Sequence, residues 1–292
     1  MALIPKIFLD CVTAIGVRNP DGSSKWIGTG FLVGRLFETD QNGIKQYHTF
    51  LVTNKHVLTD RKNIIARFNP EPSSGNTAKD YTIELVDAKG KSLWIGHPHN
   101  DVDVAVIYIN PTVLRSDGRK FACFQADESI LSIKGMAEAG ISEGDFIYAL
   151  GFPLGIVGPE MQYVIARSGI VARISDTLEG KTKDFIADIS NYPGNSGSPV
   201  ISKPANEYLD GTKCLYGSRL LGILHSYIPY TDVAVSTQTG RPRITFEENS
   251  GLALVTPTDY ITETIEIYYK TLMEPIIIQQ KEETAPTPTP SA

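Results

Sequence analysis

The sequence predicts an all-β protein of the barrel or sandwich type, for three reasons. Short segments rich in Val, Ile, Phe and Tyr recur along the chain, separated by Gly, Pro, Asn and Asp residues that form turns. Helical repeats do not alternate with these segments, which argues against a parallel α/β sheet. Hydrophobic residues make up 41% of the 292 residues, enough for one large domain or two medium subdomains.

Ten segments carry the strand pattern. In chain order they are residues 28–34, 48–53, 81–85, 104–109, 146–151, 163–174, 185–189, 199–202, 220–226 and 251–255. A short helical turn is expected over residues 130–139, and this segment is the predicted connection between two strand-rich halves. A longer helix is expected over residues 258–272, because Ile261, Ile265 and Tyr268 recur at helical spacing. Thr258 or Asp259 can cap its first turn.

Composition excludes several classes of protein. The net charge of −6 argues against a surface built to bind nucleic acid. The apolar run over residues 104–109 is far shorter than a membrane span, so no membrane association is expected. Lys6 and Asp10 interrupt any secretory signal, so the expected location is the cytoplasm. The three cysteines are then expected as reduced thiols (Cys11, Cys123 and Cys214).

Three short segments carry candidate chemistry, and their order along the chain is informative. The segment Leu51–Leu58 is rich in β-formers and delivers His56 onto a turn. Asp103 lies at the start of an apolar strand, and a glycine-rich loop at residues 193–199 holds Ser196. A serine hydroxyl needs a base within hydrogen-bond reach, and a histidine has a suitable pKa. A carboxylate fixes the tautomer of that histidine and stabilises its charged form. The amides of Gly194 and Ser196 are the candidate oxyanion hole.

With these three segments in the order His, Asp, Ser, the sequence resembles the chymotrypsin-fold (trypsin-like) serine peptidases. Flanking segments at residues 28–34, 149–155 and 168–172 resemble the bacterial Deg branch of trypsin-like peptidases, here without a PDZ domain. The resemblance implies two six-stranded antiparallel β-barrels of the chymotrypsin type with a C-terminal α-helix. It implies a serine endopeptidase that acts on a peptide or protein substrate, with no cofactor and no metal.

The resemblance also implies a division of the chain. Residues 1–128 form an N-terminal β-barrel with His56 and Asp103, and residues 129–140 connect it to the next barrel. Residues 141–256 form a C-terminal β-barrel with Ser196, and residues 257–274 form the C-terminal helix. Residues 275–292 are rich in Pro and Thr and are expected to be a disordered tail.

Several residues have competing interpretations. Asp101 lies two residues before Asp103 and would share its strand face, although Asp103 directly precedes the apolar strand. His97 and His99 suggest a metal site, but a polar loop is the simpler interpretation. Cys123 is expected as a core thiol, because no histidine or glycine loop adjoins it.

Substrate preference is indicated by two residues under the same resemblance. Ser190, six residues before Ser196, is expected near the floor of the primary pocket, and its neutrality argues against a preference for Lys or Arg. His225 lies on the segment that resembles the pocket wall, which suggests a preference for acidic or glutamine side chains. A one-residue shift of strand register would instead place His225 beside the catalytic residues or under a loop, with a preference for small apolar side chains equally open.

An alternative function remains beside the endopeptidase. The chain can be a catalytically silent or partner-activated trypsin-like domain that acts as a peptide- or protein-binding module. Under this alternative, a regulatory protein partner reshapes the loop around Ser196.

Overall fold

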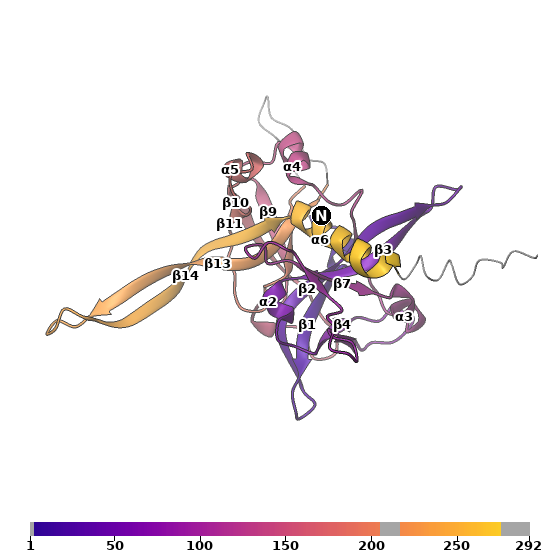
Figure 1. Cartoon of the computed structure of the whole chain (residues 1–292), viewed down its shortest axis with the longest axis horizontal. Helices are drawn as coiled ribbons and strands as arrows, with labels where there is room; N and C mark the ends of the chain where they lie inside the picture. Colours follow the sequence, from indigo (N-terminus) through magenta and orange to yellow (C-terminus); the bar gives the residue numbers. More distant parts are fainter. Residues whose placement is uncertain (1–2, 205–216, 276–292) are drawn as a thin grey trace, which may run out of the picture.

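Two β-rich units lie side by side, and a long two-stranded ribbon projects from one of them (Figure 1). The computed structural model describes residues 3–204 and 217–275. Cys214 and, apart from Pro275, the tail predicted over residues 275–292 lie outside the described residues. Within the described ranges, no helix is both long enough and apolar enough to cross a membrane.

The first unit is a curved, mainly antiparallel sheet of eight strands. Its order is β5-β4-β1-β2-β3-β7-β6, and β8 pairs with β2 in parallel. Three short helices accompany it, namely α1 (Lys6–Leu9), α2 (Lys55–Leu58) and α3 (Pro111–Ser116). The strands are β1 (Val12–Arg18), β2 (Ser24–Thr39), β3 (Lys45–Thr53), β4 (Asn63–Phe68), β5 (Lys79–Glu84), β6 (Ile95–Gly96), β7 (Ala105–Ile109) and β8 (Phe124–Gln125).

The second unit is a closed six-stranded barrel in the order β10-β11-β14-β13-β12-β9. Helix α4 (Ile133–Ala139) precedes it, and η1 (Pro153–Gly155) and α5 (Ser175–Leu178) lie in its loops. The strands are β9 (Phe146–Gly151), β10 (Ile165–Arg173), β11 (Phe185–Asp188), β12 (Ser198–Ser202), β13 (Leu220–Val235) and β14 (Pro242–Pro257).

A shared hydrophobic core joins the two units. Phe31 and Phe50 of the first sheet belong to the same buried cluster as Phe152 and Ile223 of the second unit. Burial of each such side chain stabilises the fold by about 1.5–3 kcal/mol. The shared core therefore fixes the position of one unit relative to the other.

Helix α6 (Thr258–Tyr268) follows the last strand of the barrel and packs on the first sheet. Its Ile261, Ile265 and Tyr268 are buried in the shared core. The ring of Tyr268 meets Phe50 edge-on, with 5.4 Å between the ring centroids, and its hydroxyl donates to the Leu93 carbonyl over 3.1 Å. The chain therefore returns from the second unit to the first and ties the two together.

The predicted fold class is confirmed: the protein is mostly β, with a closed barrel, a second barrel-like sheet and a short C-terminal helix. The first unit differs in detail from the predicted six-stranded barrel. Its sheet has eight strands, and β5 and β6 lie at the two ends of the strand order. The predicted C-terminal helix continues beyond α6 as a wider turn, η2 (Tyr269–Met273). Asp259 does not cap this helix, because its carboxylate instead accepts the amide of Ile133 at the start of α4 over 2.6 Å.

Candidate active site

His56 lies on the single turn of α2, directly after strand β3. Val57 and Leu58 are buried and anchor this turn against the core, whereas the side chain of His56 is 51% exposed. Asn54, the buried residue before the helix, donates from Nδ2 to the backbone carbonyl of Asp103 over 2.7 Å. The same turn that presents His56 thus also positions the segment that carries Asp103.

Asp103 contacts both the ring and the backbone of His56. Asp103 Oδ2 lies 2.5 Å from His56 Nδ1, and Oδ1 accepts the His56 backbone N–H over 3.2 Å. Burial acts to raise the pKa of Asp103, but the hydrogen bonds and the charge of His56 outweigh it and lower that pKa below its ordinary value. Asp103 is therefore ionised at neutral pH and can hold the proton of the ring on Nδ1.

Asp101, the competing carboxylate, faces elsewhere. Its side chain is 76% exposed and pairs with Lys183, whose Nζ lies 2.7 Å from Oδ2. The hydrogen bond from Lys183 lowers the pKa of Asp101. Of the two carboxylates, the structure brings Asp103 to His56 and leaves Asp101 on the surface.

The loop that carries Ser196 depends on two glycines in the left-handed region of backbone conformation. Gly194 has φ of +96° and Gly197 has φ of +88°. A Cβ atom at Gly197 would lie 2.0 Å from the Thr29 carbonyl oxygen, and one at Gly194 would lie 2.4 Å from the Phe152 carbonyl oxygen. Both positions exclude a side chain, because backbone atoms of neighbouring segments approach so closely.

Thr29 of the first sheet holds this loop from the opposite unit. Its Oγ1 donates to the Gly194 carbonyl over 2.8 Å, and its N–H donates to the Ser196 carbonyl over 2.9 Å. Its own carbonyl accepts from Thr53 Oγ1, and Thr29 is fully buried. A strand of the first unit therefore fixes the backbone of residues 194–196 in the second.

Contacts of Gly28 show how close this loop lies to α2. A Cβ atom at Gly28 would be 3.1 Å from the side chain of Val57 and 3.3 Å from the Ser196 carbonyl oxygen. Gly28 thus lies between Val57, which follows His56, and the backbone of Ser196. In the described part of the chain, no hydrogen bond joins Ser196 Oγ to the ring of His56.

The backbone amides of the loop point in defined directions. The Pro193 carbonyl accepts the Leu154 N–H over 2.6 Å. The peptide bond between Pro193 and Gly194 is trans, so the Gly194 N–H points in the opposite direction, away from Leu154. The Asn195 N–H donates to the Tyr192 carbonyl over 3.0 Å. Within residues 3–204 and 217–275, the amides of Gly194 and Ser196 have no hydrogen-bond acceptor. They are available to bind an external oxygen.

The two predicted specificity residues have different surroundings. Ser190 is partly buried and lies two residues after the end of β11. His225 occupies a register shift of β13, between the pairs Leu224↔Val255 and Ser226↔Leu254, and such a bulge redirects a side chain. Its Nε2 lies 3.3 Å from Asp184 Oδ2 without hydrogen-bond geometry, and its charge contributes to the lowered pKa of Asp103. The side-chain contacts of His225 are therefore with Asp184 and with Ser226, whose hydroxyl lies 3.0 Å from Nδ1.

Among the described residues, His97, His99 and Cys123 lie outside this arrangement. His97 is buried, with Nε2 3.2 Å from Glu263 Oε2, and its ring stacks against that of His99. No group of three or more metal-binding side chains gathers anywhere in the described ranges. Burial raises the pKa of Cys123 to about 11, so its thiol is protonated at neutral pH.

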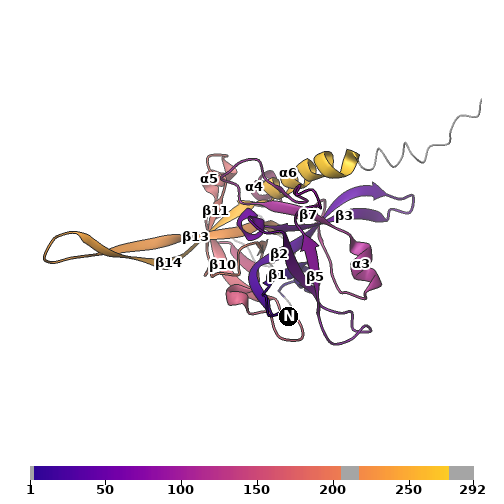
Figure 2. The same ribbon diagram turned by 60° about the horizontal axis from the view of Figure 1, so that its bottom comes forward.

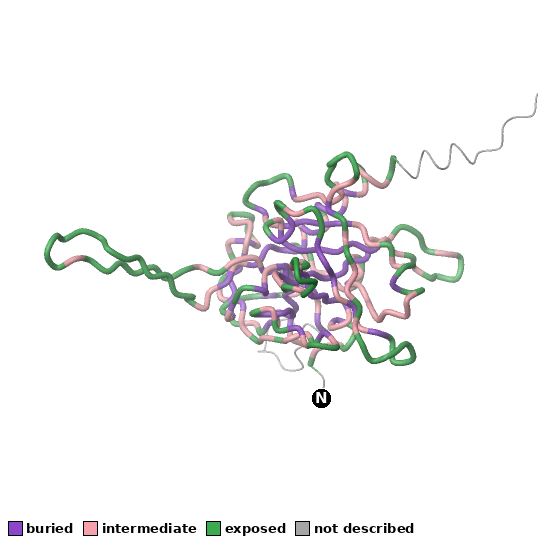
Figure 3. Tube along the Cα trace, turned by 90° about the horizontal axis from the view of Figure 1, so that it is seen from below, coloured by how far each residue is buried: buried purple, intermediate pink, exposed green. Residues whose placement is uncertain are grey.

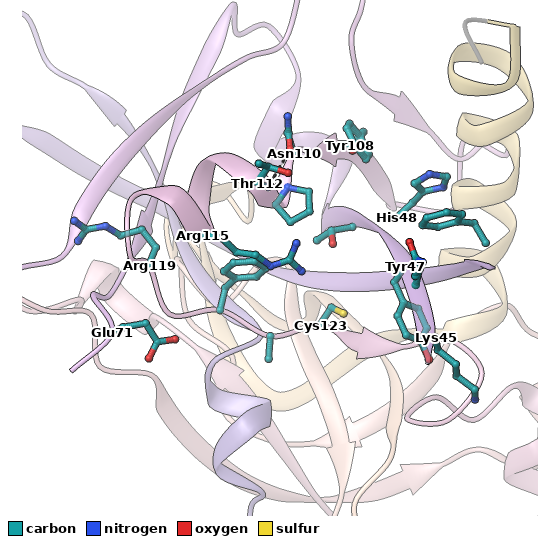
Figure 4. Close-up of a pocket in the computed structure, with 16 residues that line it drawn as sticks. Lys45, Tyr47, His48, Glu71, Tyr108, Asn110, Thr112, Arg115, Arg119 and Cys123 are labelled. Atoms are coloured by element: carbon teal, nitrogen blue, oxygen red, sulfur yellow. Dashed lines mark hydrogen bonds between the residues drawn. The ribbon is translucent and has the colours of Figure 1, made fainter. Parts of the chain in front are cut away.

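Two of the surface cavities formed by the described residues are lined by the first unit. One, of about 680 Å³, is bordered by His56 and Asp103 together with Lys55, Thr59, Asp60, Arg61 and Asn100. The other, of about 640 Å³, shares no lining residue with the first, and Figure 4 shows it with Arg115, Arg119, Tyr47 and Cys123 around it. The cavity beside the His56–Asp103 pair is the one that adjoins the candidate chemistry.

Sequence reasoning did not single out Thr29 and Leu154, which position the Ser196 loop. Thr29 lies inside a predicted strand, and its position between two glycines is the only local signal. Leu154 has φ of +57°, a conformation that its residue type does not indicate. Both act through the backbone of a segment far away in the sequence.

The comparisons with known proteins agree with this arrangement. The family model of the trypsin-like peptidase domain matches residues 28–207, more than half of the chain. The search of curated proteins found no match to this chain. The matched range contains His56, Asp103 and Ser196 as well as Thr29 and the two loop glycines. By fold and by this match, the chain belongs to the trypsin-like peptidase domain family.

Proposed function

We propose that this protein is a serine endopeptidase that hydrolyses peptide bonds through an acyl-enzyme on Ser196. Ser196 Oγ attacks the scissile carbonyl carbon while His56 Nε2 takes the hydroxyl proton. The tetrahedral intermediate then expels the amine, and His56 returns the proton to the leaving nitrogen. Water, deprotonated by His56, releases the acid product and restores Ser196.

The observation that carries this proposal is the 2.5 Å contact between His56 Nδ1 and Asp103 Oδ2. A carboxylate in that position keeps a proton on Nδ1 and leaves Nε2 free to act as the base. It also stabilises the positive charge that develops on the ring during the attack. The lowered pKa of Asp103 supports this role, because the residue stays ionised throughout the neutral range.

The free amides of Gly194 and Ser196 support a matching role for the loop. In the tetrahedral intermediate, negative charge develops on the former carbonyl oxygen, and amide donors aimed at that oxygen stabilise it. Loss of one such donor costs about 10²–10³ in rate. The bond from Leu154 to the Pro193 carbonyl supports this role by directing the Gly194 amide away from Leu154.

The substrate would be a peptide or protein, with Ser190 at the floor of the pocket for the side chain before the scissile bond. A neutral serine there disfavours Lys and Arg. The position of His225 near Asp103 and Asp184 favours a role in supporting the acid over recognition of an acidic substrate side chain. Membership of the Deg branch and a cytoplasmic location belong to this proposal as well.

A second candidate is a domain that stays silent until a partner protein binds. One observation favours it: in the described residues, Ser196 Oγ and His56 do not share a hydrogen bond. In free enzymes such bonds are often long and shorten only when substrate binds. The endopeptidase therefore remains the better supported function, and labelling distinguishes the two.

The test uses a fluorophosphonate probe, which reacts only with an activated serine. We expect the full chain to be labelled at Ser196, and we expect labelling to vanish in Ser196→Ala and in His56→Ala. Ser142→Ala is the matched control, because it removes an exposed hydroxyl outside the proposed site and should still be labelled. Labelling that requires an added partner would favour the regulated domain. A complete absence of labelling would refute the endopeptidase.

A further inference from the structure

The ribbon formed by residues 227–250 projects far from the body of the protein (Figures 1 and 2). We call this segment the arm. Its two strands are the outer parts of β13 and β14, paired from Tyr230↔Glu248 to Val235↔Pro242. Figure 3 shows it as exposed along most of its length. A two-stranded hairpin alone is at best marginally stable in water, so an arm of this length gains from further contacts.

Apolar side chains on the arm have no cover from the rest of the described structure. Ile244 is 57% exposed and Phe246 is 50% exposed, and they lie on one face of β14. Four more large apolar side chains of the arm are exposed on β13 (Tyr227, Tyr230, Val233 and Val235). Clusters of exposed apolar side chains of this kind mark interaction sites.

The outer edge of β14 is open along the arm. Near the body, residues 252–255 of β14 pair with β11 on one side and β13 on the other. Among the described residues, residues 242–249 of β14, which form the arm, pair with β13 alone. An open edge presents unpaired N–H and C=O groups, and another extended strand can pair with them.

The sequence of this edge is complementary to itself. It reads Arg243-Ile244-Thr245-Phe246-Glu247, which is basic, apolar, polar, apolar and acidic in turn. If two such strands pair antiparallel about Thr245, each Ile244 faces the other chain's Phe246. Arg243 lies in a bulge between the pairs Ala234↔Ile244 and Val235↔Pro242, and in this pairing its long side chain would lie within reach of the other chain's Glu247. Opposite charges and apolar pairs directly across a ladder are the pairs that stabilise an antiparallel sheet.

The charged members of this pattern are free to form such pairs. Within the described residues, neither Arg243 nor Glu247 takes part in an ion pair. The other edge of the arm lacks the pattern: β13 carries Asp232 with no basic residue between Tyr227 and Val235, and Pro229 cannot donate to a ladder. The charge complementarity therefore selects β14 and selects a second copy of the same chain.

We propose that two copies of this protein pair through the outer edges of β14, antiparallel about Thr245, to form a four-stranded sheet between the two arms. The pairing satisfies the open backbone groups and brings Ile244 of each chain against Phe246 of the other. It does not depend on catalysis by Ser196, so its success or failure is separate from that of the proposed peptidase activity.

The test measures molecular mass by sedimentation over a series of protein concentrations. We expect the native chain to pass from one copy to two. Arg243→Glu and Glu247→Arg each place like charges within reach of one another, so each alone should dimerise about tenfold or more weakly. An equimolar mixture of the two variants restores opposite charges at both positions and should recover a mixed dimer. Asp232→Lys, on the other strand of the arm, is the matched control and should dimerise like the native chain.

Three outcomes would overturn the proposal. The native chain could remain a single copy at every concentration, which would assign the arm to a different partner. Either single variant could dimerise as well as the native chain, or the mixture could fail to recover the dimer. The altered side chains are exposed, so the variants should have the melting temperature of the native chain at a concentration where all of them are single copies, which would show that they fold normally.

Discussion

The His56–Asp103 pair and the loop around Ser196 are held in place in different ways. The pair lies within the first unit, with His56 on the single turn of α2 and Asp103 two residues before strand β7, and more than half of the His56 side chain is exposed. The loop belongs to the second unit, but buried Thr29 of the first unit fixes its backbone at Gly194 and Ser196.

This difference shows which contacts each part of the site depends on. Asp103 and His56 meet within one unit, so under the proposed function substitution there should change chemistry with little effect on the fold. The loop adopts its conformation only when both units are assembled, so substitution there should change the fold as well. Three predictions test this contrast, from the largest expected effect to the smallest.

The largest effect is expected for Asp103→Asn. Without the carboxylate, the favoured tautomer of His56 is lost, and kcat should fall by about 10⁴, equivalent to about 5.4 kcal/mol of transition-state stabilisation. The free energy of unfolding at neutral pH should change little, because the His56 side chain is half exposed. Steady-state kinetics on a peptide substrate and urea unfolding measure the two quantities.

Asp101→Asn is the control for this change. It removes an equivalent charge two residues away, from an exposed pair with Lys183, and should leave kcat within about twofold of the native value. A loss of kcat in Asp101→Asn comparable to that in Asp103→Asn would contradict the assignment of the acid.

The second-largest effect is expected for Gly197→Ala, and it is a loss of folding stability rather than of transition-state stabilisation. The new Cβ atom would lie 2.0 Å from the Thr29 carbonyl oxygen at a backbone φ of +88°. We expect a loss of about 3 kcal/mol or more in the free energy of unfolding, measured by urea denaturation. Gly43→Ala is the control, because Gly43 has φ of +78° with open space around it and should cost only about 1 kcal/mol. Equal costs at the two positions would mean that the first unit does not constrain the loop.

The smallest effect is expected in acid. The pKa of Asp103 is lowered in the folded protein, so the ionised carboxylate stabilises the fold above the ordinary pKa of aspartate, 3.8. This contribution is lost as the pH falls through the lowered value. Since the pair with His56 is partly exposed, the contribution should be under about 1 kcal/mol. The unfolding free energies of the native chain and of Asp103→Asn should therefore differ above pH 3.8 and converge as the pH falls below it through the lowered pKa. Curves that remain parallel would refute this coupling.

Local motifs predicted the fold class and the candidate acid, base and nucleophile. A histidine on a turn after a strand, an acid before an apolar strand and a serine between glycines are all recognisable from adjacent residues. The contact between His56 and Asp103 matches this pattern in space, and Asp101 is separated from it. Thr29 and Leu154 escaped prediction because they act on a backbone more than 30 residues away, which single-sequence patterns do not encode.

Two kinds of strand were missed, for different physical reasons. Strands β6 and β8 span two residues each, too few to show a pattern, and in β4 an apolar run such as Ile64–Ile65 does not distinguish a strand from part of a buried helix. Strand β1 was missed as well. The arm continues β13 past Ser226 through Pro229 and a mixture of polar and apolar residues, which lacks the alternation of a half-buried strand. Its length follows from hairpin pairing rather than from burial.

The path of helix α6 has a consequence for how this chain tolerates cleavage. By sequence the helix belongs with the barrel, but its Ile261, Ile265 and Tyr268 are buried in the core that the two units share. A protease that cut the connection before α4 would therefore leave two fragments that remain associated. Each fragment made alone would expose Phe31, Phe50 or Ile261 to water and would need its counterpart in order to fold.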